Sequence, residues 1–290
     1  MLPGLGSEAG ADAFFLSFVK AVPQILLVLL VVFVVFLIAK DIANGMRRPF
    51  LNPEVWQTLP LVEKRQLTHN TRRLRFALPH ADQKLGLPAG RHITLRVTKK
   101  DGTHVMRPYT PVSEIAQRGF VDFVIKVYPE GRMSQALDEV AIGGLVHFKG
   151  PKGLFEHKSD SYRAIGMLAG GTGITPMYQL LQMILKDPNN RTEISLIFGN
   201  ITEEDILLRD ELAAMAAKHS KRFKVYHVLN SPPAGWTGGS GFITEDMIRK
   251  HLPAPADDVL VVRCGPLPMM MAMEGHCDAI GHSKKSQFQF

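Results

Sequence analysis

The sequence has 290 residues, 46% of them hydrophobic and 21% charged, so it can bury the cores of about two domains and is not expected to stay disordered. Lysine and arginine exceed aspartate and glutamate by 34 − 27 = 7, a balance that suits an acidic partner or an anionic membrane surface but also an ordinary soluble surface. The two cysteines, Cys264 and Cys277, are too few for a disulfide framework or a Cys-rich zinc or iron–sulfur site, and they are expected to be free thiols.

The first predicted element is an apolar helix at residues 21–40. It opens with 19 uncharged residues, AVPQILLVLLVVFVVFLIA, which as a helix would measure roughly 28 Å, close to the thickness of the bilayer core. A cleaved signal peptide would have a shorter apolar core of about 7 to 15 residues and a small-x-small cleavage site, whereas Lys40 and Asp41 follow here. The segment therefore predicts a single transmembrane anchor.

The charges that flank the anchor predict its orientation. Lys40, Arg47 and Arg48 follow the span, whereas the N-terminal segment 1–20 carries two acidic residues and one lysine. Because basic residues stay on the cytoplasmic side of a membrane, the body after the span is expected in the cytosol. Residues 41–57 are predicted to be a short tether.

Residues 58–155 predict a small antiparallel β-barrel. Strand candidates such as His92–Val97 and Val121–Tyr128 are rich in β-branched and aromatic residues, and such short strands recur at roughly ten-residue spacing. The segment Gly131–Leu137 interrupts this pattern as a helix, with Ser134 as its predicted N-cap. A helix start preceded by glycine and arginine can receive a phosphate.

Residues 156–290 predict a parallel sheet covered by helices, because apolar strand candidates alternate with helical stretches. Thr202 and Thr244 are the predicted caps of the second and third helices. The predicted strands are Ala164–Ala169, Ile194–Phe198, Phe223–Leu229 and Val259–Cys264, and the predicted helices are Pro176–Lys186, Glu203–His219 and Glu245–His251.

The Gly-rich turn Gly170–Pro176 lies at the carboxyl end of a predicted strand, where parallel sheets bind ligands. The dinucleotide fingerprint G-x-G-x-x-G would need glycine where Pro176 stands, and no P-loop Gly-Lys-Ser/Thr follows. Pro176 is predicted to begin the next helix. The turn thus predicts either a pyrophosphate bound by backbone N–H groups at the helix start or a tight turn of purely structural importance.

Two further motifs are candidates for ligand binding. Cys264-Gly265-Pro266 follows the last apolar strand at the same predicted sheet edge, and it is either part of the ligand site or a Pro-rich loop with a buried cysteine. Arg107-Pro108-Tyr109-Thr110 offers a guanidinium fork for a phosphate and an aromatic face, or it is an edge turn with an exposed arginine.

Together these motifs carry a resemblance. The Arg107 motif, Ile125–Tyr128, Gly131–Ser134, the Gly-rich turn, the Cys264 motif and the terminal Phe290 resemble, in that order, the ferredoxin-reductase-like flavoenzymes and among them the cytochrome b5 reductases. The likeness runs from about residue 55 to the C-terminus. It implies a barrel that binds FAD and an α/β domain that binds NADH. Cytochrome b5 or a similar acidic haem protein is the implied partner, with no nucleic acid, and the implied location is the endoplasmic reticulum or the outer mitochondrial membrane.

The resemblance also implies roles for individual residues. Thr175, Cys264 and Lys126 would serve hydride transfer, with Thr175 near the isoalloxazine ring and Lys126 stabilising the reduced flavin. Around FAD it places Arg107, Pro108, Tyr109, Thr110, Val124, Tyr128, Arg132, Met133, Ser134 and Phe290, and around the nicotinamide nucleotide Gly170, Gly171, Thr172, Gly173, Gly265, Pro266 and Met269.

The sequence leaves open whether the nucleotide is NADH or NADPH and which molecule accepts the electrons. Some relatives have an acidic residue where Thr237 stands, which repels the 2′-phosphate of NADPH, so NADPH use is an alternative to NADH. A quinone or another haem protein is an alternative acceptor. A membrane scaffold with an inactive nucleotide-binding fold is the alternative from a different functional class.

Overall fold

The computed structural model describes residues 8–99, 101–157 and 161–290, and residues 1–7 of the predicted N-terminal segment lie outside this range. The chain forms two units, residues 1–48 and a body of residues 49–290. The first unit contains the helix α1 (Glu8–Arg47), so the helix continues into the predicted tether. Within it, Val22–Lys40 has a mean hydropathy of 3.1 and is long enough to cross a membrane. Its apolar side chains from Leu26 to Ile38 are 44 to 61% exposed.

The body begins with an antiparallel six-stranded sheet that curls around one core. Its strands lie in the order β4-β3-β6-β1-β2-β5. All six contribute inward-facing apolar residues to a single cluster, which confirms the predicted barrel. The strands are β1 (Gln57–Thr68), β2 (Thr71–Ala77), β3 (His92–Thr98), β4 (His104–Tyr109), β5 (Phe120–Lys126) and β6 (Leu145–Lys152).

The helix α2 (Arg132–Glu139) lies between β5 and β6 in the chain, as predicted, but Ser134 is not its N-cap. Gly131 holds the cap position, and Ser134 is the third helical residue. The Ser134 hydroxyl donates to the Gly131 carbonyl at 3.0 Å and accepts from the Tyr128 N–H at 3.1 Å. The side chain thus fixes the loop before the helix.

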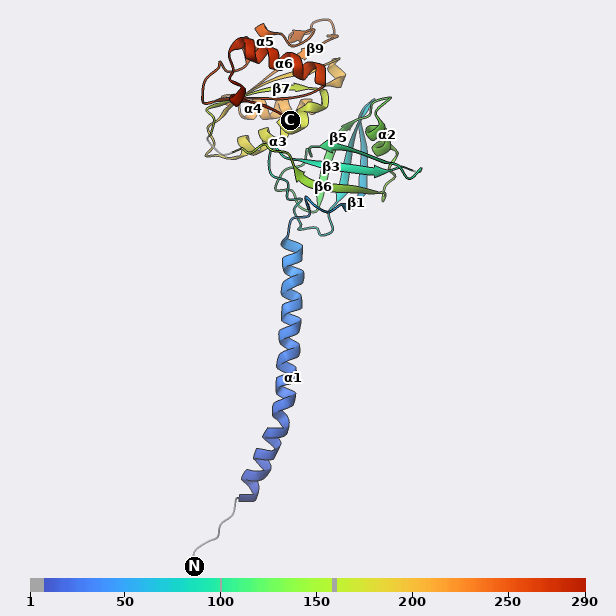
Figure 1. Ribbon diagram of the computed structural model, residues 1–290, viewed down its shortest axis with the longest axis vertical. Coiled ribbons are helices and arrows are strands. Elements are labelled where there is room, and N and C mark those ends of the chain that lie inside the picture. Colours follow the sequence, from blue (N-terminus) through green and yellow to red (C-terminus); the bar gives the residue numbers. More distant parts are fainter. Residues whose placement is uncertain (1–7, 100, 158–160) are drawn as a thin grey trace, which may run out of the picture. The chain divides into compact units, whose positions relative to one another are not determined.

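The second half of the body is a parallel six-stranded sheet in the order β10-β9-β8-β7-β11-β12, which confirms the predicted α/β class. Helices cover both faces, with α5 and α6 above β7 and α3 and α4 below it in Figure 1. The strands are β7 (Ala164–Gly170), β8 (Glu193–Asn200), β9 (Phe223–Leu229), β10 (Gly239–Ser240), β11 (Val259–Cys264) and β12 (Gln287–Gln289). The helices are α3 (Ile174–Lys186), α4 (Arg209–Lys218), α5 (Glu245–His251) and α6 (Leu267–Ile280), with short 3₁₀ turns η1 (Gly171–Gly173), η2 (Glu203–Asp205) and η3 (Lys284–Ser286).

The side chains of β7 show how both faces are used. Ile165, Met167 and Ala169 belong to the core that includes α3 and α4, whereas Leu168 belongs to the core that includes α5 and α6. All four are fully buried, as expected for a strand covered on both faces.

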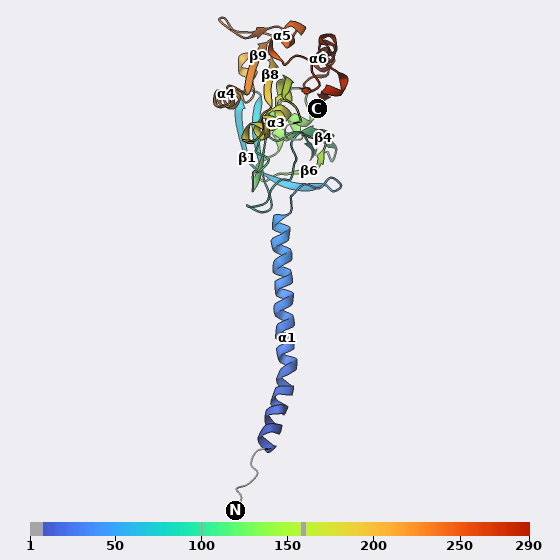
Figure 2. The same ribbon diagram turned by 90° about the vertical axis from the view of Figure 1, so that its left-hand side faces the viewer.

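The helix α3 also joins the two sheets, and it lies between them in Figures 1 and 2. Its Gln179 side chain accepts from the Gly90 N–H at 2.7 Å, and the Gln182 amide donates to the Val112 carbonyl at 3.2 Å. Both glutamines are buried, so these bonds tie the parallel sheet to loops of the barrel where water cannot compete.

Two predicted boundaries were wrong. The helix predicted at residues 203–219 is broken, because the chain leaves η2 to bury Ile206 and Leu207 and then turns at Leu208, whose φ is +56°. The helix α3 begins at Ile174, so Pro176 is its third residue. Proline fits there because the first four N–H groups of a helix have no intrahelical acceptor. Both predicted caps hold the N-cap position: Thr202 precedes η2, and Thr244 accepts from the Met247 N–H at the start of α5.

Candidate functional site

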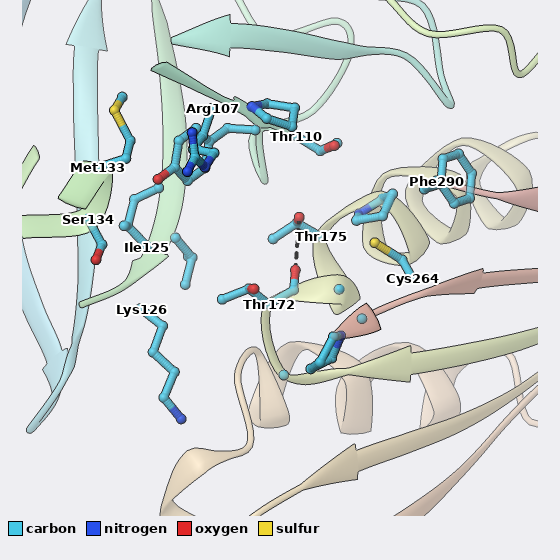
Figure 3. Close-up of a pocket in the computed structure, with 18 of the residues that line it drawn as sticks. Arg107, Thr110, Ile125, Lys126, Met133, Ser134, Thr172, Thr175, Cys264 and Phe290 are labelled. Atoms are coloured by element: carbon cyan, nitrogen blue, oxygen red, sulfur yellow. Dashed lines mark hydrogen bonds between the residues drawn. The ribbon is translucent and has the colours of Figure 1, made fainter. Parts of the chain in front are cut away.

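A cavity of about 680 Å³ lies where the two sheets meet (Figure 3). One wall comes from the barrel, through β4, β5 and the start of α2. The other comes from the parallel sheet, through the Gly-rich turn, the loop after β11 and the C-terminal Phe290. Motifs from distant parts of the sequence therefore line the same cavity.

The barrel wall presents a cation and a buried phenol. Arg107 is exposed, and its guanidinium donates to the Met106 carbonyl at 2.8 Å. Among the described residues it has no carboxylate partner, which leaves its fork for an anionic ligand. Tyr109 lies edge-on to Phe123, and burial raises the pKa of its phenol to about 12. Tyr109 is therefore a neutral donor and an apolar face at physiological pH.

The start of α2 supplies backbone donors to the same wall. A side chain at Gly131 would lie 3.0 Å from the Tyr128 Cβ and would collide with the Ser134 hydroxyl, so the tight approach requires glycine. The first N–H groups of this eight-residue helix have no intrahelical acceptor and favour anions. Arg132 is exposed at this position, whereas Met133 is buried.

The opposite wall is built by two turns in direct contact. Strands β7 and β11 pair in parallel with Ala169 opposite Cys264, so both turns leave the same sheet edge, as predicted. A Cβ atom added to Gly173 would lie 2.5 Å from the Cys264 carbonyl carbon and 2.9 Å from the Gly265 nitrogen. Gly171 has a φ of +52°, which glycine adopts without strain.

Thr175, Cys264 and Phe290 close this wall. The Thr175 hydroxyl donates to the Thr172 carbonyl at 3.2 Å, the bond drawn in Figure 3. Burial raises the pKa of the Cys264 thiol from 9.0 to about 11, so it is a packing group and not a nucleophile at neutral pH. Phe290 packs against Phe155, and its N–H donates to the Arg263 carbonyl at 3.0 Å.

Lys126 lines the pocket, but its ammonium has a carboxylate partner. The Nζ atom donates to Asp205 Oδ1 at 2.6 Å, and in Figure 3 the side chain extends away from Arg107 and Met133. From the resemblance, this ammonium was expected to stabilise a reduced flavin, and Asp205 was not among the predicted site residues. No local pattern links the two residues, which are 79 positions apart in the chain.

Most of the other predicted residues line the cavity, and two do not. Thr237 lies on an exposed loop before β10, and the Met269 sulfur packs against Gly170. The cavity also has lining residues that sequence reasoning missed, namely Gly90, His92, Ile125, Glu130, Gly131 and Pro176. Of these, Ile125, Gly131 and Pro176 stood inside recognised motifs, whereas Gly90 and His92 carried no signal.

Comparison with known proteins agrees with this geometry. The sequence model of the oxidoreductase FAD-binding domain matches residues 58–157, and that of the oxidoreductase NAD-binding domain matches residues 167–275. A protein of Dictyostelium discoideum named NADH-cytochrome b5 reductase 1 is 51% identical over 240 residues, which cover 83% of each chain. The chain belongs to the NADH-cytochrome b5 reductase family.

Two further relatives support the assignment. Human NADH-cytochrome b5 reductase 1 is 45% identical, with 84% of this chain and 89% of the human protein covered. The crystal structure of the cytochrome b5 reductase domain of Ulva prolifera nitrate reductase superposes with a TM-score of 0.80 at 38% identity. That match covers 84% of this chain and all of the algal domain. The chain is therefore an FAD-dependent oxidoreductase that uses NADH.

The residues of the pocket fit both cofactors of the family. The exposed Arg107 fork and the free N–H groups at the start of α2 suit the pyrophosphate of FAD. The glycines of the opposite turn let a second dinucleotide come close to the backbone, since Gly171 has open space where a side chain would begin.

Both cysteines are expected to resist alkylation at neutral pH. Burial raises the pKa of Cys264 and of Cys277 from 9.0 to about 11. Only the thiolate reacts, so this higher pKa reduces the reactive fraction of each thiol roughly a hundredfold relative to an exposed cysteine. Intact-mass analysis after iodoacetamide should show slow modification at pH 7.5 that accelerates with each unit of pH. Complete modification within minutes at pH 7.5 would contradict this expectation.

Proposed function

We propose that this chain is a membrane-anchored reductase that takes a hydride from NADH and passes single electrons to cytochrome b5 or a similar acidic haem protein. The observation that carries the proposal is the pocket. One of its walls comes from the FAD-binding domain and the other from the NAD-binding domain, and the sequence motifs of both domains line it. The names of the relatives in Dictyostelium discoideum and Homo sapiens support cytochrome b5 as the acceptor.

The chain's own residues have the tasks of binding, orienting and excluding water. FAD, when bound, supplies the conversion of a two-electron hydride into single electrons. With the cofactors bound, Arg107 would neutralise the pyrophosphate, Thr175 and Cys264 would orient the flavin and nicotinamide rings, and Phe290 would exclude water from the flavin. We assign Pro108, Tyr109, Thr110, Val124, Tyr128, Arg132, Met133 and Ser134 to the FAD site, and Gly170, Gly171, Thr172, Gly173, Gly265 and Pro266 to the nucleotide site. Met269, outside the cavity lining, would support that site through its contact with Gly170.

The helix α1 is the proposed membrane anchor. Its span Val22–Lys40 exposes apolar side chains along its length, which water disfavours and lipid accepts. The basic residues that follow the span favour a cytosolic body. As its location we propose the endoplasmic reticulum or the outer mitochondrial membrane. An anchor on the same membrane as the haem protein raises the frequency of their encounters.

The proposal is tested with the full chain in phospholipid vesicles, supplied with NADH and either cytochrome b5 or a soluble quinone. Cytochrome b5 should be reduced the faster, and its rate should fall as salt screens the attraction between the basic reductase and the acidic acceptor. Efficient reduction of the quinone alone would instead favour a different acceptor. Reduction of neither would favour the non-catalytic scaffold.

Thr237 is the proposed determinant of the choice between NADH and NADPH. It is exposed in a turn that the Trp236 indole fixes by donating to the Gly239 carbonyl at 3.0 Å, and a threonine there supplies no charge against a 2′-phosphate. We expect Thr237→Asp to raise the ratio of kcat/KM for NADH over NADPH at least about tenfold, because like charges repel. Thr237→Asn is the matched neutral control, and an unchanged ratio in Thr237→Asp would remove this residue from cofactor selection.

A further inference from the structure

Two ion pairs join the barrel to the parallel sheet among the described residues. Lys126 of β5 binds Asp205 of η2, with side chains only 11% and 9% exposed. Lys186 at the end of α3 binds Glu114 on a barrel loop, with side chains 55% and 53% exposed. The first pair lies at the wall of the cofactor pocket, and the second lies in solvent, where an ion pair contributes little.

Two hydrogen bonds from Thr202, in addition to the bond from Lys126, hold the Asp205 carboxylate in one orientation. Its Oδ2 atom accepts from the Thr202 N–H and from the Thr202 hydroxyl, each at 3.2 Å, while Oδ1 accepts from Lys126. The turn that carries it directly follows β8, and the next two residues, Ile206 and Leu207, are buried in the core of the parallel sheet. The carboxylate is therefore fixed to the nucleotide-binding half of the body.

The charge on Asp205 persists at neutral pH. Burial by itself raises the pKa of the carboxyl, but the hydrogen bond and positive charge of Lys126, with the two Thr202 donors, outweigh it and lower the pKa below its usual value. A buried ammonium that lost this partner would be an uncompensated charge, which is strongly unfavourable. The pair thus constrains where β5 can lie relative to η2.

This constraint acts on the pocket itself. Val124 and Ile125, which precede Lys126 on β5, line the barrel wall of the cavity. Thr172 and Thr175 line the wall of the other sheet, whose strand β8 leads into η2. Lys126 itself lines the cavity, so the ion pair links the barrel wall directly to η2.

We propose that Asp205 is a positioning residue for hydride transfer. It holds the Lys126 ammonium across the boundary between the two sheets, and so fixes the distance between the barrel wall of the pocket and the opposite wall. The inference rests on the proposed function, because the spacing matters only if a hydride crosses the pocket. A misplacement of about 1 Å between reacting groups can slow a reaction roughly a hundredfold.

The test compares Asp205→Asn with Glu114→Gln in the FAD-loaded full chain. Asp205→Asn keeps the shape and the acceptor for Thr202 but removes the charge, whereas Glu114→Gln breaks the exposed pair. Stopped-flow measurement of flavin reduction by NADH should give a limiting rate ten- to a hundredfold lower in Asp205→Asn, with a KM for NADH within about threefold of the native value. Glu114→Gln should reduce at the native rate.

Hydrogen exchange of the backbone amides, measured on the FAD-loaded chain without NADH, gives a readout that does not depend on activity. Amides of residues 124–128 and 202–208 should exchange faster in Asp205→Asn and stay unchanged in Glu114→Gln. Native reduction rates or native exchange in Asp205→Asn would overturn the inference, as would equal effects of the two variants. Failure of the native chain to be reduced by NADH would instead refute the proposed function.

Asp205→Glu keeps the test valid if Asp205→Asn does not fold. The longer carboxylate retains the charge and both partners but shifts Lys126, so the limiting rate should fall several-fold while FAD remains bound. A native rate and native exchange in Asp205→Glu, in the absence of folded Asp205→Asn, would overturn the inference.

Discussion

Gly173→Ala is expected to destabilise the body and nearly abolish flavin reduction. The added methyl would lie 2.5 Å from the Cys264 carbonyl carbon and 2.9 Å from the Gly265 nitrogen, and these backbone atoms cannot rotate away as a side chain could. Forced overpacking of this kind costs about 3 kcal/mol, and for a body of this size that lowers Tm by roughly 6 to 12 °C. The displaced turns should slow flavin reduction by NADH about a hundredfold.

A second glycine provides the matched control for this substitution. Gly275 lies on the exposed face of α6 with no atom within 4 Å of an added methyl. Gly275→Ala should therefore raise stability by about 0.5 to 1 kcal/mol through helix propensity and leave the reduction rate unchanged. Thermal unfolding and stopped-flow reduction of both variants check the pair. A Gly173→Ala variant with native Tm and native rate would show that the two turns do not need their close contact.

Arg107→Ala is expected to release FAD. The guanidinium of Arg107 has no carboxylate partner among the described residues, and charge-assisted bonds to a phosphate are worth about 1.5 to 3 kcal/mol. Loss of these bonds should raise the Kd for FAD about ten- to a hundredfold. Titration of the apoprotein with FAD, followed by quenching of flavin fluorescence, measures the change.

Arg249→Ala is the control for the loss of one positive charge. Arg249 is exposed on α5, pairs with Glu245 one turn away, and does not line the pocket. Its removal should leave the FAD affinity within the error of the titration. If Arg107→Ala bound FAD as tightly as Arg249→Ala, the pyrophosphate would have to be neutralised elsewhere in the pocket.

Local patterns predicted the fold class and most elements of the body. Strand β11 coincides with the prediction at Val259–Cys264, because a continuous apolar run flanked by breakers is typical of a buried parallel strand. Helix α5 coincides at Glu245–His251, because its cap and its acidic first turn can be read from sequence. The start of α3 was placed two residues late because Pro176 was taken as the helix start.

Features that depend on distant contacts could not be read from the sequence. Strand β12 is three polar and aromatic residues long, and only its pairing with Val261–Arg263 makes it a strand. Serine is a typical N-cap residue, but the Ser134 hydroxyl instead accepts from the Tyr128 N–H in the preceding loop. The partner of Lys126 is set by how the two halves of the body pack, so Asp205 carried no signal in the sequence.

FAD is expected to occupy the pocket between the two sheets, within hydride reach of NADH. The most direct measurement is the absorption spectrum of the purified full chain, recorded without oxygen before and after one equivalent of NADH is added. The account predicts the bands of a bound flavin, which NADH bleaches within the mixing time of a manual experiment. A colourless chain that takes up no FAD, or a bound flavin that NADH leaves oxidised, would contradict it.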